Sequence, residues 1–450
     1  MKKKADKFKD IEKRSWLYSF IKFVVKFWHN YIFYEKYEIR GIENIPANDY
    51  KIFAPNHQNG LMDPLGILFA TKDQVVFVAR ADLFKNKWIA RVLYTFKILP
   101  IFRMRDGKEN LSENEAVFQK TKDVIVAKKP FTIFPEAAHN FQKTLLSVKK
   151  GVPRIVFITE AENNYSLNIK IVPIGIYYTE YTGYRKKILV NFGKPFETKQ
   201  YSEQSKENEP KAMLAMRDTL GTELDKLVLN IKHPTHYNEI DTICEVLHPE
   251  VSVQNKFPAS ALTSEMDSKR IINSSLQEIE NTKPEVFAQL MQKANTFKQI
   301  ITENNLSYNI LIAAPGIEKI AGRLISLLAL LPLQLIAMLV YGPPVFISKF
   351  ITAKVKDVSF YNTILFPLGL FFFYIYLIVG FILVWALADL AFYKWLWLIL
   401  FPIGYQLYFG WFALLHETLQ MIKLSFNRTL KLKLEILHQF FSTEVLGQKN

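Results

Sequence analysis

His57 and Asp63 stand close together in the stretch Asn56–Pro64, and their residue types suit proton transfer. The apolar residues Ile52–Ala54 before them predict a strand, and the apolar run after them predicts a helix. An imidazole can take a proton from a hydroxyl near neutral pH, while a neighbouring carboxylate fixes its tautomer and stabilises the imidazolium. The stretch contains no Ser, Thr or Cys that would serve as a nucleophile. We therefore expect the activated hydroxyl to belong to a substrate.

A structural interpretation of the same pair stays open. Asp63 followed by Pro64 is typical of a helix N-cap with proline in the first helical position. In that case Asp63 only caps a helix, and His57 is a hydrogen-bonded loop residue. The stretch alone does not decide between these two roles.

Basic residues after a second apolar run indicate a phosphate site. The run Ile98–Phe102 leads to Arg103 and Arg105, and the arginine side chain is well suited to binding two phosphate oxygens at once. Lys150, which opens a helix-like run, would add positive charge to such a site. The alternative is a solvated pair of charges after a strand.

A carboxylate follows a third apolar run. Glu136 comes after the predicted strand Phe131–Phe134 and Pro135, which places it at the mouth of a sheet. It would either hold a polyol hydroxyl of a substrate or accept hydrogen bonds from backbone N–H groups of its loop. The segment Val172–Gly175 interrupts a strand and is expected to form a wall of an apolar pocket.

Strands and helices alternate from Tyr37 to Phe196, which predicts a layered α/β domain. In such a domain the functional residues lie in the loops at strand ends. The predicted strands are Tyr37–Arg40, Lys51–Ala54, Val75–Ala79, Phe131–Phe134, Ile169–Tyr177 and Ile188–Phe192, with helices such as Pro64–Ala70 and Glu113–Ala127 between them.

The composition indicates a membrane as partner. Half of the 450 residues are hydrophobic, 14% are aromatic, and the formal net charge is +15. A positive surplus suits anionic partners, and the long apolar runs favour a phospholipid surface over nucleic acid. The single Cys244 excludes an internal disulfide and a cysteine-based zinc site. His233 and His236 lack a nearby third ligand, so we expect no metal.

Four segments are candidates for membrane contact. Trp16–Phe33 is predicted to be a basic, aromatic-rich amphipathic helix lying at a membrane interface, or alternatively a helix facing the core. The runs Leu324–Tyr341, Leu365–Leu387 and Trp395–Leu415 approach or reach the length that crosses a bilayer.

Positive charge flanks the last two runs, so both flanks are expected on the cytoplasmic side, with Asp389 and Lys394 at the tip of a helical hairpin. Pro332 and Gly342–Pro344 make the first run either a bent, re-entrant segment or a third full span. We expect an integral membrane protein whose soluble domain lies in the cytoplasm. The expected segments are a basic tail with an interfacial helix (1–34), an α/β domain (35–200), a mostly helical soluble region (201–320), membrane segments (321–416) and a basic cytoplasmic tail (417–450).

The ordered set of motifs resembles the glycerolipid acyltransferase family, which includes glycerol-3-phosphate and 1-acylglycerol-3-phosphate acyltransferases. The family's four blocks correspond here to Asn56–Asp63, Pro100–Arg103, Phe134–Glu136 and Val172–Pro173, in the same order. The resemblance covers about Tyr37 to Phe196. It implies a layered acyltransferase domain with a mixed sheet flanked by helices, joined to a helical region and C-terminal transmembrane helices.

Two departures from the family pattern bear on the substrate. Five residues, Gln58–Met62, separate the histidine from the aspartate where four are usual. This spacing resembles a eukaryotic-like branch that acylates glycerol-3-phosphate or dihydroxyacetone phosphate. Ala137 stands where glycine is usual, and its Cβ is expected to crowd an approach of substrate to the backbone.

The resemblance implies transfer of an acyl group from acyl-CoA or acyl-carrier protein to a glycerophosphate hydroxyl in phospholipid biosynthesis, with no cofactor besides that co-substrate. His57 and Asp63 would be catalytic, and the substrate-binding residues would be Asn56, Arg103, Arg105, Glu136 and Lys150. A lysophospholipid acyltransferase and a non-catalytic lipid-binding membrane protein remain as alternatives.

Overall fold

The computed structural model describes residues 11–101, 111–311, 316–387 and 391–447. The chain divides into two compact units, Met1–Val228 (unit 1) and Leu229–Asn450 (unit 2). Each unit is described by itself.

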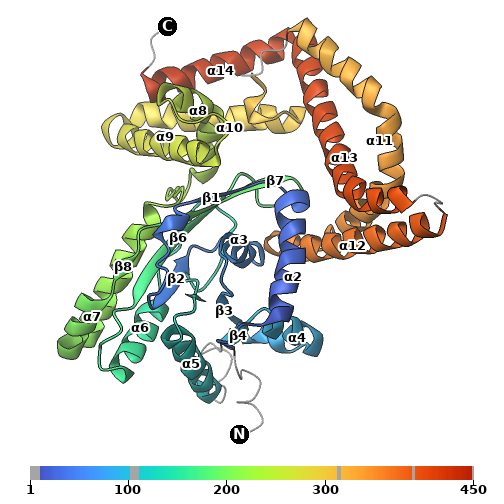
Figure 1. Ribbon diagram of the computed structural model, residues 1–450. Helices are drawn as coiled ribbons and strands as arrows, with labels where there is room; N and C mark the ends of the chain where they lie inside the picture. The colour runs from blue at the N-terminus through green and yellow to red at the C-terminus, as the bar shows by residue number, and fades with distance from the viewer. Residues whose placement is uncertain (1–10, 102–110, 312–315, 388–390, 448–450) are drawn as a thin grey trace. The chain divides into compact units, whose positions relative to one another are not determined.

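A mixed β-sheet forms the centre of unit 1 (Figure 1). Over the described residues it has eight strands in the spatial order β1-β7-β6-β2-β5-β3-β4, with β8 paired to β6. β6 runs antiparallel to β7 and β8, and the other neighbours are parallel. The strands are β1 (Tyr34–Arg40), β2 (Lys51–Pro55), β3 (Val76–Arg80), β4 (Ile98–Ile101), β5 (Phe131–Thr132), β6 (Lys170–Tyr178), β7 (Lys186–Phe192) and β8 (Phe196–Glu197).

Strand β2 is the strand that positions the candidate site. It lies between β5 and β6 and is parallel to both, with Phe53 opposite Thr132 and Val172. All five of its residues are buried, as expected for a strand covered on both faces. Because parallel strands end at the same edge of a sheet, the loops that follow β2 and β5 come together there.

Helices cover both faces of this sheet. They are α2 (Trp16–Phe27), continued by the short π-helix η2 (Trp28–Phe33), and α3 (Met62–Ala70), α4 (Lys87–Thr95), α5 (Leu111–Val126), α6 (Gly151–Glu162) and α7 (Lys199–Asp225). Ile52 and Ala54 of β2 belong to one buried cluster with α5, α6 and α7. On β1 the hydroxyl of Tyr37 donates to Gly66 O of α3 at 2.7 Å. The predicted mixed sheet with flanking helices is confirmed.

Helix α7 belongs to the core of unit 1, although the sequence predicted a new segment from residue 201. Met216, Leu220 and Leu224 are buried with the strands and with α6. The polar stretch that resembled a boundary contains a kink instead, with non-helical backbone at Asn208 two residues before Pro210. A proline inside a helix removes one backbone hydrogen bond and crowds the preceding turn.

Unit 2 combines a helical bundle with long apolar helices. α8 (Tyr237–Gln254), α9 (Leu262–Thr282), α10 (Pro284–Asn304) and α14 (Arg428–Leu446) pack together. The residues after 417 were predicted as a basic tail, but they form the end of one long helix and then α14. Phe441 of α14 packs against Phe297 of α10, with ring centroids 5.9 Å apart. This segment is therefore part of the bundle.

In the described part of unit 2, three helices are long and apolar enough to cross a membrane: α11 (Ile317–Thr352), α12 (Tyr361–Leu387) and α13 (Ala391–Phe426). α11 continues as one curved helix through Pro332, Pro343 and Pro344 (Figure 1). This continuity favours a full span over the re-entrant segment. Asp389 lies outside the described residues, and the side chain of Lys394 is not described.

The structure predicts opposite effects for two glycine substitutions in unit 1. A Cβ at Gly175 of β6 would lie 2.3 Å from Leu227 O, whereas one at Gly221 of α7 would lie 3.8 Å from Val148 Cγ2. We expect Gly175→Ala to lower the free energy of unfolding by about 1–3 kcal/mol and Gly221→Ala to raise it by about 0.5–1 kcal/mol. Thermal unfolding of the full chain in detergent measures both, and an unchanged midpoint in Gly175→Ala would contradict the close approach of Leu227.

Candidate active site

His57 and Asp63 are in direct contact at the end of β2. Nδ1 of His57 lies 2.7 Å from Oδ2 of Asp63. An ionised carboxylate only accepts hydrogen bonds, so Nδ1 carries the hydrogen and Nε2 has the free lone pair. The His57 side chain is 18% exposed, whereas that of Asp63 is fully buried. This arrangement gives an accessible proton acceptor that is oriented from behind.

Asp63 does not cap helix α3, which corrects the helix-cap interpretation. The helix begins at Met62, and its N-cap residue makes no side-chain cap hydrogen bond. Instead, Oδ2 of Asp63 accepts the backbone N–H groups of Gln58 and Asn59, both at 2.7 Å. Its other oxygen, Oδ1, accepts the hydroxyl of Tyr178 at 2.6 Å. The carboxylate therefore orders the turn that carries His57.

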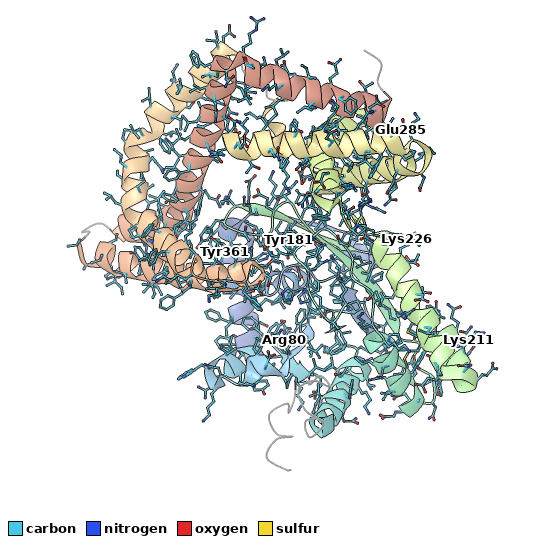
Figure 2. The ribbon with its side chains drawn as sticks, turned by 180° about the vertical axis from the view of Figure 1, so that it is seen from behind. Arg80, Tyr181, Lys211, Lys226, Glu285 and Tyr361 are labelled. Carbon is cyan, nitrogen blue, oxygen red and sulfur yellow. The ribbon has the colours of Figure 1, made fainter. Side chains whose placement is uncertain are left out.

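The five residues between the histidine and the aspartate form a tight turn around this carboxylate. Met62 N donates to Asn59 O at 2.7 Å, and the Asn59 side-chain amide donates to Tyr181 O at 2.9 Å. Tyr181 follows the end of β6 (Figure 2). The turn thus directs two backbone N–H groups at Asp63 and connects through Asn59 to the loop after β6.

Aromatic rings fix the plane of the His57 imidazole. Phe134, just after β5, stacks on it with ring centroids 4.1 Å apart and an interplanar angle of 26°. His139 lies edge-on at 5.3 Å. The parallel pairing of β2 with β5 brings these residues together although they are far apart in the sequence.

Glu136 holds the two loops of the site together. Its Oε1 accepts the backbone N–H of His57 at 2.6 Å, and its Oε2 accepts that of Leu146 at 2.7 Å. Its side chain is buried, so the geometry fits the alternative of a carboxylate that orders loop backbone. Burial raises the pKa of Glu136 to about 7, the two N–H groups oppose this shift, and the Asp63 carboxylate adds to it.

The other predicted substrate-binding residues do not contact the ring of His57 in the described part of the chain. The side-chain amide of Asn56 is buried and bonds both backbone groups of Ile176, which joins β2 to β6. Lys150 is exposed directly before α6, next to Lys149, whose N–H donates to Pro135 O at 2.8 Å. Lys150 therefore lies near the Glu136 loop in the fold. Arg103 and Arg105 lie outside the described residues.

Tyr178 is the site residue that the sequence analysis missed. Burial, together with the Asp63 carboxylate, raises the pKa of Tyr178 well above its ordinary value, so it acts as a hydrogen-bond donor. It is the last residue of β6, the strand that contains the Val172–Pro173 motif. Strand alternation places Tyr178 on the same face as Ile176, but only the pairing of β6 with β2 reveals its contact with Asp63.

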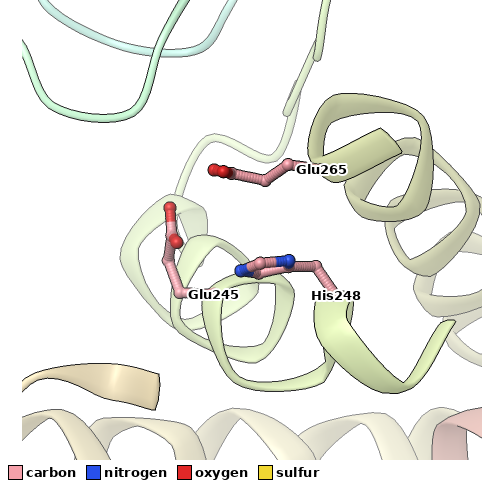
Figure 3. Close-up of side chains that lie close together, drawn as sticks. All are labelled: Glu245, His248 and Glu265. Atoms are coloured by element: carbon pink, nitrogen blue, oxygen red, sulfur yellow. The ribbon is translucent and has the colours of Figure 1, made fainter. Parts of the chain in front are cut away.

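A second ionisable cluster lies in unit 2, where Glu245, His248 and Glu265 converge (Figure 3). Their ligand atoms are within 4.8 Å of one another. The fully buried ammonium of Lys269 lies 2.7 Å from a carboxylate oxygen of both Glu245 and Glu265. These two carboxylates raise the pKa of Lys269 despite its burial, so the cluster already contains a cation paired with both of them. We therefore interpret it as an ion-pair network between α8 and α9.

Residues 36–177, less than half of the chain, match the family model described as Acyltransferase. The matched segment includes His57, Asp63 and Glu136. Among solved structures, the chain is similar to the 1-acyl-sn-glycerophosphate acyltransferase PlsC of Thermotoga maritima, with 21% identity, coverage of 46% of this chain and 78% of that chain, and a TM-score of 0.32. No curated protein matches the chain. The family model supports acyl transfer as the class of reaction.

The pKa of Glu136 predicts a pH-dependent stability. Its folded-state pKa of about 7 lies above the ordinary value of 4.5, so the folded state binds a proton more tightly than the unfolded state. Protonation of Glu136 therefore contributes on the order of 3 kcal/mol to the free energy of unfolding below pH 4.5. This contribution is lost as the pH rises through about 7. Across this pH range, the midpoint of thermal unfolding should depend less on pH in Glu136→Gln than in the parent protein.

The matched control is Glu160→Gln, because Glu160 is also buried and bonds two backbone N–H groups, those of Leu167 and Ile169. If Glu160→Gln reduced the pH dependence of unfolding as much as Glu136→Gln does, the pH dependence could not be assigned to Glu136.

Ala137 is predicted to be strained. It has a φ of 59°, in the left-handed region that favours glycine. We expect Ala137→Gly to raise the free energy of unfolding by about 1 kcal/mol, measured by thermal unfolding. Ala138→Gly, at a neighbouring exposed position with negative φ, is the control and should not stabilise the chain.

Proposed function

We propose that this protein transfers a fatty acyl group from acyl-CoA or acyl-carrier protein to a glycerophosphate hydroxyl, with glycerol-3-phosphate as the preferred acceptor. The observation that carries the proposal is the hydrogen bond between Nδ1 of the partly exposed His57 and the buried Asp63, which orients the imidazole so that Nε2 can act as a base. The family match over residues 36–177 supports the reaction class.

The chemistry is a direct transfer. Nε2 of His57 takes the proton of the acceptor hydroxyl as its oxygen attacks the thioester carbonyl carbon. The resulting tetrahedral species collapses with cleavage of the C–S bond, and the departing thiolate receives the proton from the imidazolium. Asp63 stabilises the imidazolium between these two proton transfers. A thioester has a good leaving group, so base catalysis and positioning supply most of the barrier reduction.

Asp63 performs this role only if its carboxylate stays fixed. It is held from one side by the N–H groups of Gln58 and Asn59 and from the other by Tyr178. In this proposal Tyr178 and Glu136 are positioning residues, since Glu136 binds the backbone of His57 and not its ring. Asn56 has the same role, because it secures the end of β2 against β6.

Recognition of the acceptor is assigned to the basic residues at the end of the second motif and directly before α6. Arg103 and Arg105 would bind the phosphate through guanidinium forks, and Lys150 at the start of α6 would add positive charge. The acyl chain requires an apolar environment. The candidate membrane helices α11, α12 and α13 would keep the enzyme at the bilayer where such chains reside. The basic flanks of α12 and α13 favour a cytoplasmic catalytic domain.

His57→Ala is expected to lower the transfer rate on the order of 10²–10⁴-fold, since the general base is lost. The assay measures CoA release from a long-chain acyl-CoA with glycerol-3-phosphate, using purified protein in detergent. His236→Ala changes a partly exposed histidine of unit 2 and should leave the rate unchanged. An unchanged rate in His57→Ala, with CoA release by the parent protein, would contradict the assignment.

The same assay identifies the acceptor. Glycerol-3-phosphate, dihydroxyacetone phosphate and a single-chain lysophospholipid are compared at equal concentration. Transfer to the lysophospholipid alone would replace glycerol-3-phosphate as the proposed acceptor. Absence of CoA release with every acceptor would favour the non-catalytic lipid-binding alternative.

A further inference from the structure

Helix α4 has an exposed apolar face that the site does not use. Trp88 is 76% exposed, and Ile89 and Val92 are also exposed. Their spacing of one and four residues places all three on one side of the helix, while Ala90 is buried. The Asn86 side chain accepts the N–H groups of Trp88 and Ile89, which fixes the start of the helix. The exposed face is therefore a defined part of the fold.

Helix α2 has a similar face. Trp16 is 78% exposed, and Phe20 and Phe23 are exposed on the same side. Trp16 and Phe20 stack with ring centroids 5.8 Å apart. The opposite side, with Tyr18 and Val25, is buried. The helix thus packs on the domain with one side and leaves large aromatic side chains uncovered on the other.

The two helices are held next to each other in unit 1 (Figure 1). Phe96, the C-cap residue of α4, contacts the Tyr18 ring edge-on at 6.1 Å. The ammonium of Lys97 lies over the same ring and donates to Lys13 O, just before α2. These contacts fix α4 relative to α2.

Positive charge surrounds the apolar face of α4. Lys85, Lys87 and Arg91 are exposed, and the Arg91 guanidinium lies 6.0 Å from the centroid of the Trp88 ring. Tryptophan and basic residues together favour the headgroup region of a bilayer, where the ring is partly buried and the charges meet anionic lipid. The same chain includes α11, α12 and α13, which are candidates to cross a membrane.

We propose that Trp16, Phe20, Phe23, Trp88, Ile89 and Val92, here called the α2/α4 surface, bind the surface of an anionic phospholipid bilayer. α4 inserts its three apolar side chains below the headgroups, and Lys85, Lys87 and Arg91 contact the lipid phosphates. This contact adds a second helix to the interfacial role expected for α2. It is independent of the proposed acyl transfer, because it concerns lipid binding alone.

The test places a fluorescent label on α4 of the full chain reconstituted in nanodiscs. Val92→Cys introduces an exposed thiol, while the native Cys244 is buried, and the unsubstituted chain gives the labelling background. Lys211→Cys on α7 is the matched exposed control in unit 1 (Figure 2). Ile89→Cys provides a second reporter on the same face if Val92→Cys fails to fold.

Bromine-labelled lipid acyl chains should quench the label at residue 92 several-fold more than at residue 211, and aqueous iodide should do the reverse. The difference should be larger with phosphatidylglycerol than with phosphatidylcholine alone, and Lys87→Glu with Arg91→Glu should reduce that lipid preference. Equal iodide quenching at both positions would overturn the proposal. Shielding at residue 92 from both quenchers would also overturn it, because it would indicate a protein partner.

Discussion

The buried carboxylate of Asp63 is the constraint on which the site depends. It accepts four hydrogen bonds, from the ring of His57, from the backbone of Gln58 and Asn59, and from the hydroxyl of Tyr178. A buried charge without such partners would be too costly to retain. The same group therefore orders the turn, selects the histidine tautomer and connects β2 to the end of β6. The geometry of the candidate site and the local folding of this turn therefore depend on the same side chain.

A second carboxylate supports the arrangement from the other side. Glu136 joins the backbone of His57 to that of Leu146, so the loop after β5 is fixed to the loop after β2. Phe134 in the same loop stacks on the imidazole. The histidine is thus held by its ring nitrogen, its ring face and its backbone. These three contacts restrict the orientation of the imidazole, as the proposed role of a base requires.

The sequence predicted the layered fold well, because alternating apolar runs and turn residues are local signals. It also predicted the contact of His57 with Asp63, but not the partners of the other site residues. The partners of Glu136 and Tyr178 depend on the order of strands in the sheet, which no local pattern encodes. The helix-cap interpretation of Asp63 was wrong because the backbone N–H groups of the preceding turn bind that carboxylate instead.

Helices α7 and α11 also show what the sequence could and could not predict. The polar start of α7 resembled a linker, but the apolar residues that bury it, such as Met216 and Leu220, follow later in the same helix. The prolines of α11 left a bent, re-entrant segment and a full span both open, and the helix continues through them. Prolines are tolerated inside apolar helices where neighbouring helices and local adjustments satisfy the freed carbonyl groups. Arg103 and Arg105 remain predictions.

The length of α13 has a mechanical consequence. Its 36 residues give a rod of about 54 Å, whereas the hydrocarbon core of a bilayer is about 30 Å thick. A crossing helix of this length projects beyond the hydrocarbon core. Near its end, Gln420 accepts hydrogen bonds from Ser307, and Lys423 donates to Asn304 O at the end of α10. If α13 crosses a membrane, these contacts near its end would fix the distance between the α8–α10 bundle and the bilayer.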